Sequence, residues 1–243
     1  MSPVPIRNGL YAPNGDCIAS NVTWLDWCRA IPVGATMGTR TESFLSDLIG
    51  FVQPGFSTHI MTAVGPGTNR VPGEANVVSA DGLGKNSRAV VENAMDFYLR
   101  DNKGNLNPKA KVVAYAYEGL SVYQQEAIVK GALKFVGCKY DYRGFASFVL
   151  QWGNDDGRFF CSELGAHVML RCDAVQIRIF PLGYDPHKVG PGVVDKWMLS
   201  EEATQIPGIR PYVAGTWGWH WDDAEDRDWF YNKVLGNEDR RAS

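Results

Sequence analysis

The stretch Phe159–Cys172, with the sequence FFCSELGAHVMLRC, constrains the fold of this chain more than any other part of it. Five of its residues recur at helical spacing and therefore share one face: Cys161, Leu164, Gly165, Val168 and Cys172. The pattern predicts a helix of about three turns that begins near Cys161. Unpaired N–H groups and the positive end of the helix dipole favour a thiolate in the first turn, so Cys161 is a candidate nucleophile. The alternative is a buried core thiol, which is the common state of free cysteine.

A cysteine nucleophile works with an imidazole that accepts and returns a proton, and the chain has four histidines. His167 follows Cys161 by six residues, so it points to a different side of the same predicted helix. His187 lies in the turn-like segment DPHKVG, and His220 lies in a cluster of tryptophans. His59 is the remaining candidate, against the alternative of an ordinary half-buried strand histidine.

His59 lies in the first of two consecutive predicted strands. Residues Ser57–Val64 alternate in the manner of a strand, and Glu74–Ala80 form a second strand after a turn region rich in proline and glycine. An antiparallel hairpin of the two places Glu74 beside His59. The alternative for Glu74 is a solvated charge at the end of a strand.

The other segments complete an α+β pattern. Helices are predicted over residues 41–52, 87–99 and 121–136, and strands over 109–117 and within 30–40. Ser121 and Gln124 fit a capping box at the start of the third helix, and Gly137 fits its end. We therefore expect the cysteine-bearing helix to pack on an antiparallel sheet built from the strands near residues 59, 75 and 112.

Composition and charge exclude several classes of partner. The net charge of the 243 residues is −3 and no basic stripe is visible, so nucleic acid is not an expected partner. The apolar runs, such as FASFVLQW at 145–152, are far shorter than the roughly 18–20 residues that span a bilayer, so no membrane span is expected. The first residues lack the apolar segment of a secretory signal.

The five cysteines, Cys17, Cys28, Cys138, Cys161 and Cys172, are widely spaced. Their number is odd and no C-x-x-C pair occurs, so we predict neither a zinc site nor a disulfide framework. Reduced thiols and the missing signal together predict a cytoplasmic protein. The sequence predicts no cofactor and no metal.

Three stretches resemble the permuted branch of the NlpC-type papain-like superfamily, which includes YiiX-like and lecithin–retinol-acyltransferase-like proteins. They are FSTHIMTAVG at 56–65, GEANVVSADGL at 73–83 and KYDYRGFASFVLQWGNDDGRFFCSELGAHV at 139–168. In this branch the histidine strand comes first and the cysteine helix last, which is the order seen here. The resemblance covers roughly residues 33–200 and implies a circularly permuted papain-like fold.

The resemblance implies a role for each matching residue. Cys161 would be the nucleophile, His59 the general base and Glu74 the residue that orients the imidazole. Asp81, at the end of the same strand as Glu74, is the alternative orienting carboxylate. Tyr140 would line the site and help to hold the oxyanion with the Cys161 N–H.

The chain departs from the family pattern in two places. The segment IPVGATMGTR stands where the family has a Gly-Asp-aliphatic opening strand, and Gly165 stands where it has an aliphatic residue. A glycine there would let another part of the chain, or a substrate, approach closely.

The residue patterns and the family resemblance together predict a cysteine hydrolase that cleaves an amide or peptide bond through an acyl-enzyme. Two alternatives remain open: a lipid thioesterase or acyltransferase that uses the same dyad, and a non-catalytic binding module on the same fold. A structural protein with an aromatic interaction surface near Trp217–Trp229 is a further possibility. We expect an irregular N-terminal arm over 1–30, the catalytic domain over 31–205 and an aromatic-rich extension over 206–243. The sequence leaves the oligomeric state open.

Overall fold

The computed structural model describes residues 8–41, 56–65, 75–84, 87–100, 105, 107, 110–141, 158–170, 185–200, 202–205 and 208–219. Ten strands in these ranges form one sheet, in the order β2-β1-β10-β7-β3-β4-β5-β6-β8-β9. Neighbouring strands pair antiparallel, except for β8 and β9, which pair in parallel. The expected α+β class is confirmed.

The strands are β1 (Gly9–Tyr11), β2 (Cys17–Ala19), β3 (Thr36–Arg40), β4 (His59–Gly65), β5 (Asn76–Gly84), β6 (Ser87–Ala94), β7 (Lys111–Glu118), β8 (Lys139–Tyr140), β9 (Arg158–Phe159) and β10 (Arg210–Trp217). The α-helices are α1 (Trp24–Ala30), α3 (Val122–Leu133), α5 (Cys161–Leu170) and α6 (Pro191–Met198), and the 3-10 helices are η1 (Met95–Leu99), η3 (Pro186–Lys188) and η4 (Glu202–Gln205).

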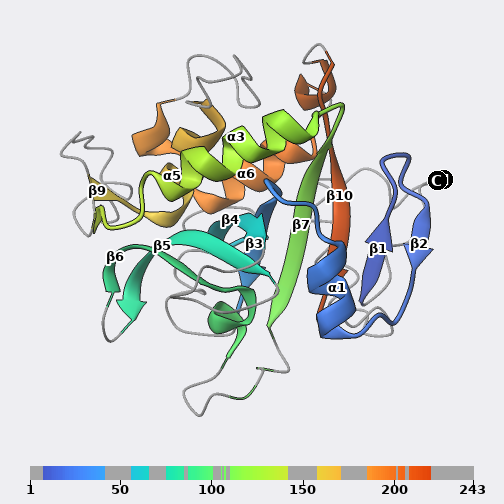
Figure 1. Ribbon diagram of the computed structural model, residues 1–243, viewed down its shortest axis with the longest axis horizontal. Coiled ribbons are helices and arrows are strands. Elements are labelled where there is room, and N and C mark those ends of the chain that lie inside the picture. Colours follow the sequence, from blue (N-terminus) through green and yellow to red (C-terminus); the bar gives the residue numbers. More distant parts are fainter. Residues whose placement is uncertain are drawn as a thin grey trace, which may run out of the picture.

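The sheet separates two hydrophobic cores, and strand β4 contributes to both. Ile60 and Val64 belong to the core that also contains residues of α3, α5 and α6. Met61 and Ala63 belong to the opposite core, together with Trp27 of α1. This alternation is the period of two expected of a strand buried on both faces. Figure 1 shows α3, α5 and α6 gathered on one side of the central strands.

Several predicted elements are confirmed. The strands near residues 59, 75 and 112 correspond to β4, β5 and β7, and α5 packs against β4 and β5 as expected. Helix α3 begins with the predicted capping box, in which Gln124 N–H donates to Ser121 Oγ and Ser121 N–H donates to Gln124 Oε1. Gly137 follows the helix with a φ of +95°, a conformation that suits glycine. The helix predicted over 41–52 lies outside the described residues, apart from residue 41.

The helix predicted over 87–99 is wrong. Residues Ser87–Ala94 form strand β6, and only Met95–Leu99 form a short 3-10 helix. Val90 pairs with Ala80 of β5 and is fully buried, and Val91 pairs with Ser79. The hairpin with β5 therefore outweighs the helical spacing of the apolar residues, because β-branched residues pack well on a pleated surface.

The two ends of the described chain belong to the same sheet as the centre. Residues expected to form an irregular arm contain β1, β2 and α1, and β1 pairs with β10, which pairs in turn with β7. The expected boundaries near residues 30 and 205 therefore fall between strands of one continuous sheet.

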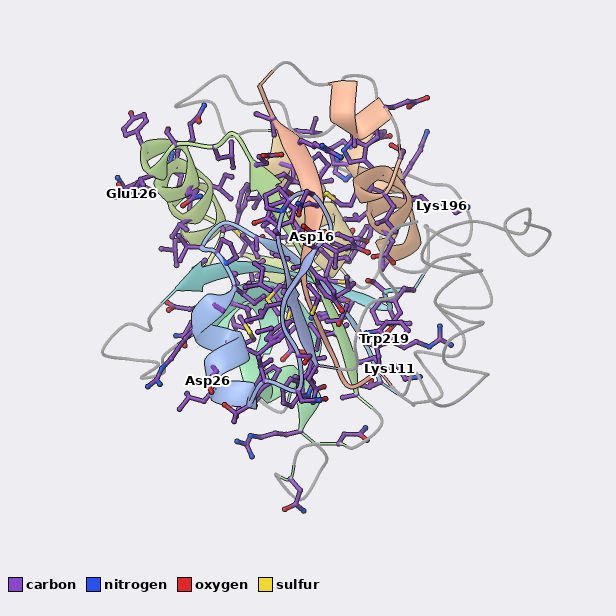
Figure 2. All side chains as sticks on the ribbon, turned by 90° about the vertical axis from the view of Figure 1, so that its right-hand side faces the viewer. Asp16, Asp26, Lys111, Glu126, Lys196 and Trp219 are labelled. Carbon is purple, nitrogen blue, oxygen red and sulfur yellow. The ribbon has the colours of Figure 1, made fainter. Side chains whose placement is uncertain are left out.

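Trp219 belongs to the hydrophobic core on the α5 side of the sheet. It is fully buried, stacks on Phe56 with ring centroids 4.6 Å apart, and donates from Nε1 to the Val112 carbonyl at 3.2 Å. Lys111 lies over its ring with Nζ 5.5 Å from the centroid, and the two side chains can be followed together in Figure 2. The aromatic surface considered for the C-terminal part therefore does not include Trp219, while Trp221 and Trp229 lie outside the described residues.

Candidate active site and an adjacent carboxylate–histidine cluster

Cys161 is the first residue of α5, where the sequence placed it. The Phe160 carbonyl accepts the first helical bond, from Leu164 N–H at 2.9 Å. Glu163 reaches back to the start of the helix, and its Oε2 accepts from Phe160 N–H at 3.1 Å. Phe160, Glu163 and Leu164 therefore make the glutamate half of a capping box at the helix start, which fixes the position of the cysteine.

The thiol of Cys161 is buried and neutral, which corrects the expectation of a thiolate. Burial raises its pKa to about 11, because an apolar surrounding penalises the charged form. Hydrogen bonds from the backbone of Ile60, Ser162 and Cys161 itself oppose this shift without overcoming it. The helix start thus supplies donors for a charged sulfur, but desolvation holds the proton on the sulfur in this conformation.

His59 is the first residue of β4 and is half-buried. Its Nε2 lies 2.7 Å from Ser79 Oγ on the neighbouring strand β5. Burial lowers the pKa of His59 to about 4, and the negative charge of Asp81 partly opposes that shift. The imidazole is therefore neutral at neutral pH and able to accept a proton. The backbone of Ile60, the residue that follows His59 on β4, acts on the Cys161 sulfur, so the start of α5 lies against the start of this strand.

Of the two orienting carboxylates considered, Asp81 lies in the described structure and Glu74 lies outside it. Asp81 is buried on β5, two residues after Ser79, and its charge acts on His59. Ser79 itself was missed by the sequence reasoning. Its position two residues before Asp81 on an alternating strand was the available signal, because it puts both side chains on one face.

Tyr140 lies on the strand that pairs with the segment leading to Cys161. It belongs to β8, pairs with Phe159 of β9, and packs half-buried against the core that contains α5. Cys161 follows Phe159 by two residues, so the predicted lining role of Tyr140 is compatible with its place in the sheet. The role in holding an oxyanion remains a prediction.

A buried network holds the segment that leads into His59. Asp195 of α6 accepts hydrogen bonds from Ser57 N–H at 2.6 Å, Ser57 Oγ at 2.8 Å and Tyr115 OH at 3.0 Å. Gly38 of β3 makes room for it, because a Cβ there would lie 1.8 Å from Ser57 Oγ. This network fastens the chain two residues before the candidate base and was not visible in the sequence.

A second group of polar side chains lies on another side of α5. The ligand atoms of Glu163, His167 and His187 all lie within 4.8 Å of one another. Glu163 Oε1 is in contact with His187 Nδ1 and lies 4.0 Å from His167 Nε2. The pKa of Glu163 is raised to about 7, chiefly by burial and also by the charge of Asp141, and Phe160 N–H and His187 oppose this shift.

The sequence alone did not bring these residues together. From their positions, His167 was expected to be a poor partner for Cys161, and His187 was expected to lie in a turn. The helical spacing of Glu163 and His167, four residues apart, was a readable signal that both side chains lie on one side of α5. The approach of His187 depends on the tertiary fold.

Comparisons with known proteins give similarities to solved structures alone. No family model matches the chain, and no curated protein matches it. The crystal structure of metalloprotein YiiX from Escherichia coli O157:H7 aligns with a TM-score of 0.44 and 22% sequence identity, over 76% of this chain and 89% of that chain. Among the described helices, none is both long and apolar enough to cross a membrane.

Proposed function

We propose that this protein is a cysteine hydrolase in which Cys161 attacks a carbonyl carbon and His59 transfers the proton. The observation that carries the proposal is the packing of α5 on β4, where the backbone of Ile60, the residue after His59, acts on the sulfur of Cys161, the first residue of α5. The order of β4 before α5 in the chain fits the permuted papain-like arrangement that the sequence resembles.

The contacts of Ser79 suggest which nitrogen of His59 is basic. The Ser79 hydroxyl lies 3.3 Å from the Ile60 carbonyl, which can only accept, and 2.7 Å from His59 Nε2. A hydroxyl that donates to the carbonyl accepts from Nε2–H, which leaves the lone pair on Nδ1. In this proposal Nδ1 is the base, Ser79 fixes the tautomer, and Asp81 stabilises the imidazolium once it forms.

The reaction then starts from a neutral thiol and a neutral imidazole. The proton moves from Cys161 to His59 as the sulfur–carbon bond forms, and the N–H groups at the start of α5 stabilise the developing negative charge. His59 gives this proton to the leaving amine or alcohol when that bond breaks. Water then attacks the thioester, gives a proton to His59, and the proton returns to the sulfur as the acid is released.

The proposal is tested by trapping the acyl-enzyme. The parent protein, Cys161→Ala, His59→Ala and the control Cys138→Ala are incubated with peptidyl amides and with short- and long-chain acyl esters. Turnover and intact mass are followed, and the modified residue is mapped. We expect an acyl adduct on Cys161 in the parent and the control, no adduct in Cys161→Ala, and a loss of turnover on the order of 10²–10⁴-fold in His59→Ala.

The substrate series separates amide or peptide hydrolysis from lipid acyl chemistry, since both use the same thiol. An adduct on another residue, or turnover that survives in Cys161→Ala, contradicts the proposed nucleophile. A folded parent protein that neither turns over nor forms an adduct with any probe favours the non-catalytic binding module.

A further inference from the structure

We propose that Glu163, His167, His187 and Asp141 bind a divalent transition metal ion of the zinc class. The ligand atoms of the first three already lie within 4.8 Å of one another. Around a tetrahedral zinc with bonds of about 2.0–2.2 Å, ligand atoms lie roughly 3.3–3.5 Å apart. Closing the site around these three requires inward movements on the order of an ångström, and Asp141, which lies outside the group of three, must approach further. The inference does not depend on the proposed hydrolase activity.

Three separate segments bring the ligands together. Glu163 and His167 lie one turn apart on α5 and so share a side of that helix. His187 comes from η3, whose first turn is fixed by a hydrogen bond from His187 N–H to Asp185 Oδ1 at 3.1 Å. Asp141 directly follows β8, and its N–H donates to the Phe159 carbonyl at 3.1 Å.

Asp141 is the observation that points to a fourth ligand. Its side chain is only 2% exposed, and its Oδ1 is buried with no hydrogen-bond partner among the described residues. Its negative charge acts on Glu163, so the two carboxyl groups lie near each other in the interior. Two adjacent buried carboxylates are costly unless a cation balances them. A divalent ion with two neutral imidazoles makes the group electrically neutral.

The types of ligand and the apolar residues around them favour a metal ion of the zinc class. Imidazole and carboxylate are ligands that zinc shares with neighbouring transition metals, whereas calcium and magnesium prefer oxygen ligands alone. The ring of His167 packs at 5.2 Å from Phe159 and at 6.3 Å from Phe135, which keeps that side of the site dry. Four protein ligands and no open position are typical of a structural site. The ion would fasten η3 and the end of β8 to the first two turns of α5.

The test uses the full chain after chelator treatment and dialysis. Zinc is titrated by calorimetry, and cobalt is titrated by visible absorption. We expect one ion per chain, a tetrahedral cobalt spectrum without a thiolate-to-cobalt charge-transfer band, and a raised melting temperature with the metal. The missing charge-transfer band separates this site from adventitious binding by the cysteines.

Matched variants assign the ligands. His187→Gln and Asp141→Asn should weaken zinc binding by more than about 100-fold, beyond the loss expected for an outer-sphere partner. Glu126→Gln, on the outer face of α3 (Figure 2), should bind as the parent does. His187 is 19% exposed on a short helix, so circular dichroism should confirm that its variant folds. Absence of zinc and cobalt binding in the parent overturns the proposal, as does unchanged affinity in His187→Gln. Unchanged affinity in Asp141→Asn contradicts the four-ligand site.

Discussion

At the scale of single residues, the candidate site depends on polar groups that lie far apart in the sequence. Cys161 and His59 were identified from their own segments, because a helix start and a strand start are local features. Ser79 meets His59 across 20 residues of chain, and Asp195 meets Ser57 across 138. The contact of Asp195 leaves no local pattern and could not be predicted, whereas Ser79 shares an alternating strand with Asp81 and could have been found from that spacing.

Asp195 should make stability depend on pH in a specific way. Burial raises the pKa of Asp195 from 3.8 to about 6, so the folded protein holds this proton more tightly than the unfolded chain does. The resulting stabilisation is complete below about pH 3.8 and is lost as the pH rises through about 6. The shift corresponds to a loss of about 3 kcal/mol across that window. His59 and Glu163 also titrate in this range, so the loss is measured as the difference in the free energy of unfolding between the parent protein and Asp195→Asn in urea, which should shrink by this amount from pH 4 to 7.

The control for this pH dependence is Glu126→Gln, which changes an exposed carboxylate on α3. Its free energy of unfolding should follow the parent curve from pH 4 to 7. If Asp195→Asn follows the parent curve as well, Asp195 is not the group responsible.

At the scale of elements, the close packing of α5 on β4 depends on Gly165. A Cβ at this position would lie 2.9 Å from Ile60 Cγ2, in the strand that carries His59. Ile60 is fully buried, so it has little room to move. A close approach was expected at this glycine, and Ile60 is the residue that approaches it.

Two helical glycines provide a matched pair of substitutions. Gly165→Ala should lower the free energy of unfolding by about 1–3 kcal/mol, because the added methyl group overpacks the contact with Ile60. Gly131→Ala in α3 should instead leave stability unchanged or raise it by up to about 1 kcal/mol, since nothing lies within 4 Å of its Cβ and alanine favours a helix. Chemical denaturation of both variants measures the difference. Equal effects at the two sites would mean that helix propensity, not packing, decides the outcome at Gly165.

The elements that were predicted correctly carry strong local signals, and those that were missed do not. Helix α3 has its capping box, and β4 and β7 have alternating or β-branched residues. Strand β10 begins with Arg-Pro and contains Gly215, a residue that weakens a strand pattern. That glycine is needed because a Cβ there would lie 2.7 Å from Trp27 Nε1. Helix α6 begins with Pro191-Gly192, which resembled a turn although proline suits the first helical position.

At the scale of the whole molecule, the sheet connects the candidate site to the N-terminal residues. Strands β1 and β10 pair, β10 pairs with β7, and β7 is joined through β3 to β4. Helix α1 packs on this sheet with Trp27 fully buried, and Trp24 stacks on Trp27 with centroids 5.3 Å apart. A continuous sheet with a core on each face is expected to unfold as one cooperative unit.

Trp27→Ala should therefore destabilise the site around Cys161 as much as it destabilises α1. Truncation of a fully buried tryptophan costs about 3–5 kcal/mol, and Leu25→Ala, at a neighbouring position that is 44% exposed, should cost less than about 1 kcal/mol. Unfolding in urea is followed by circular dichroism and, in parallel, by the rate at which iodoacetamide modifies Cys161, which is buried in the folded state. We expect both midpoints to fall together in Trp27→Ala and to stay near the parent values in Leu25→Ala. If the Cys161 midpoint stays at the parent value while the circular dichroism signal shifts, the N-terminal residues form a separate unit, and the boundary expected near residue 30 marks a true division of the protein.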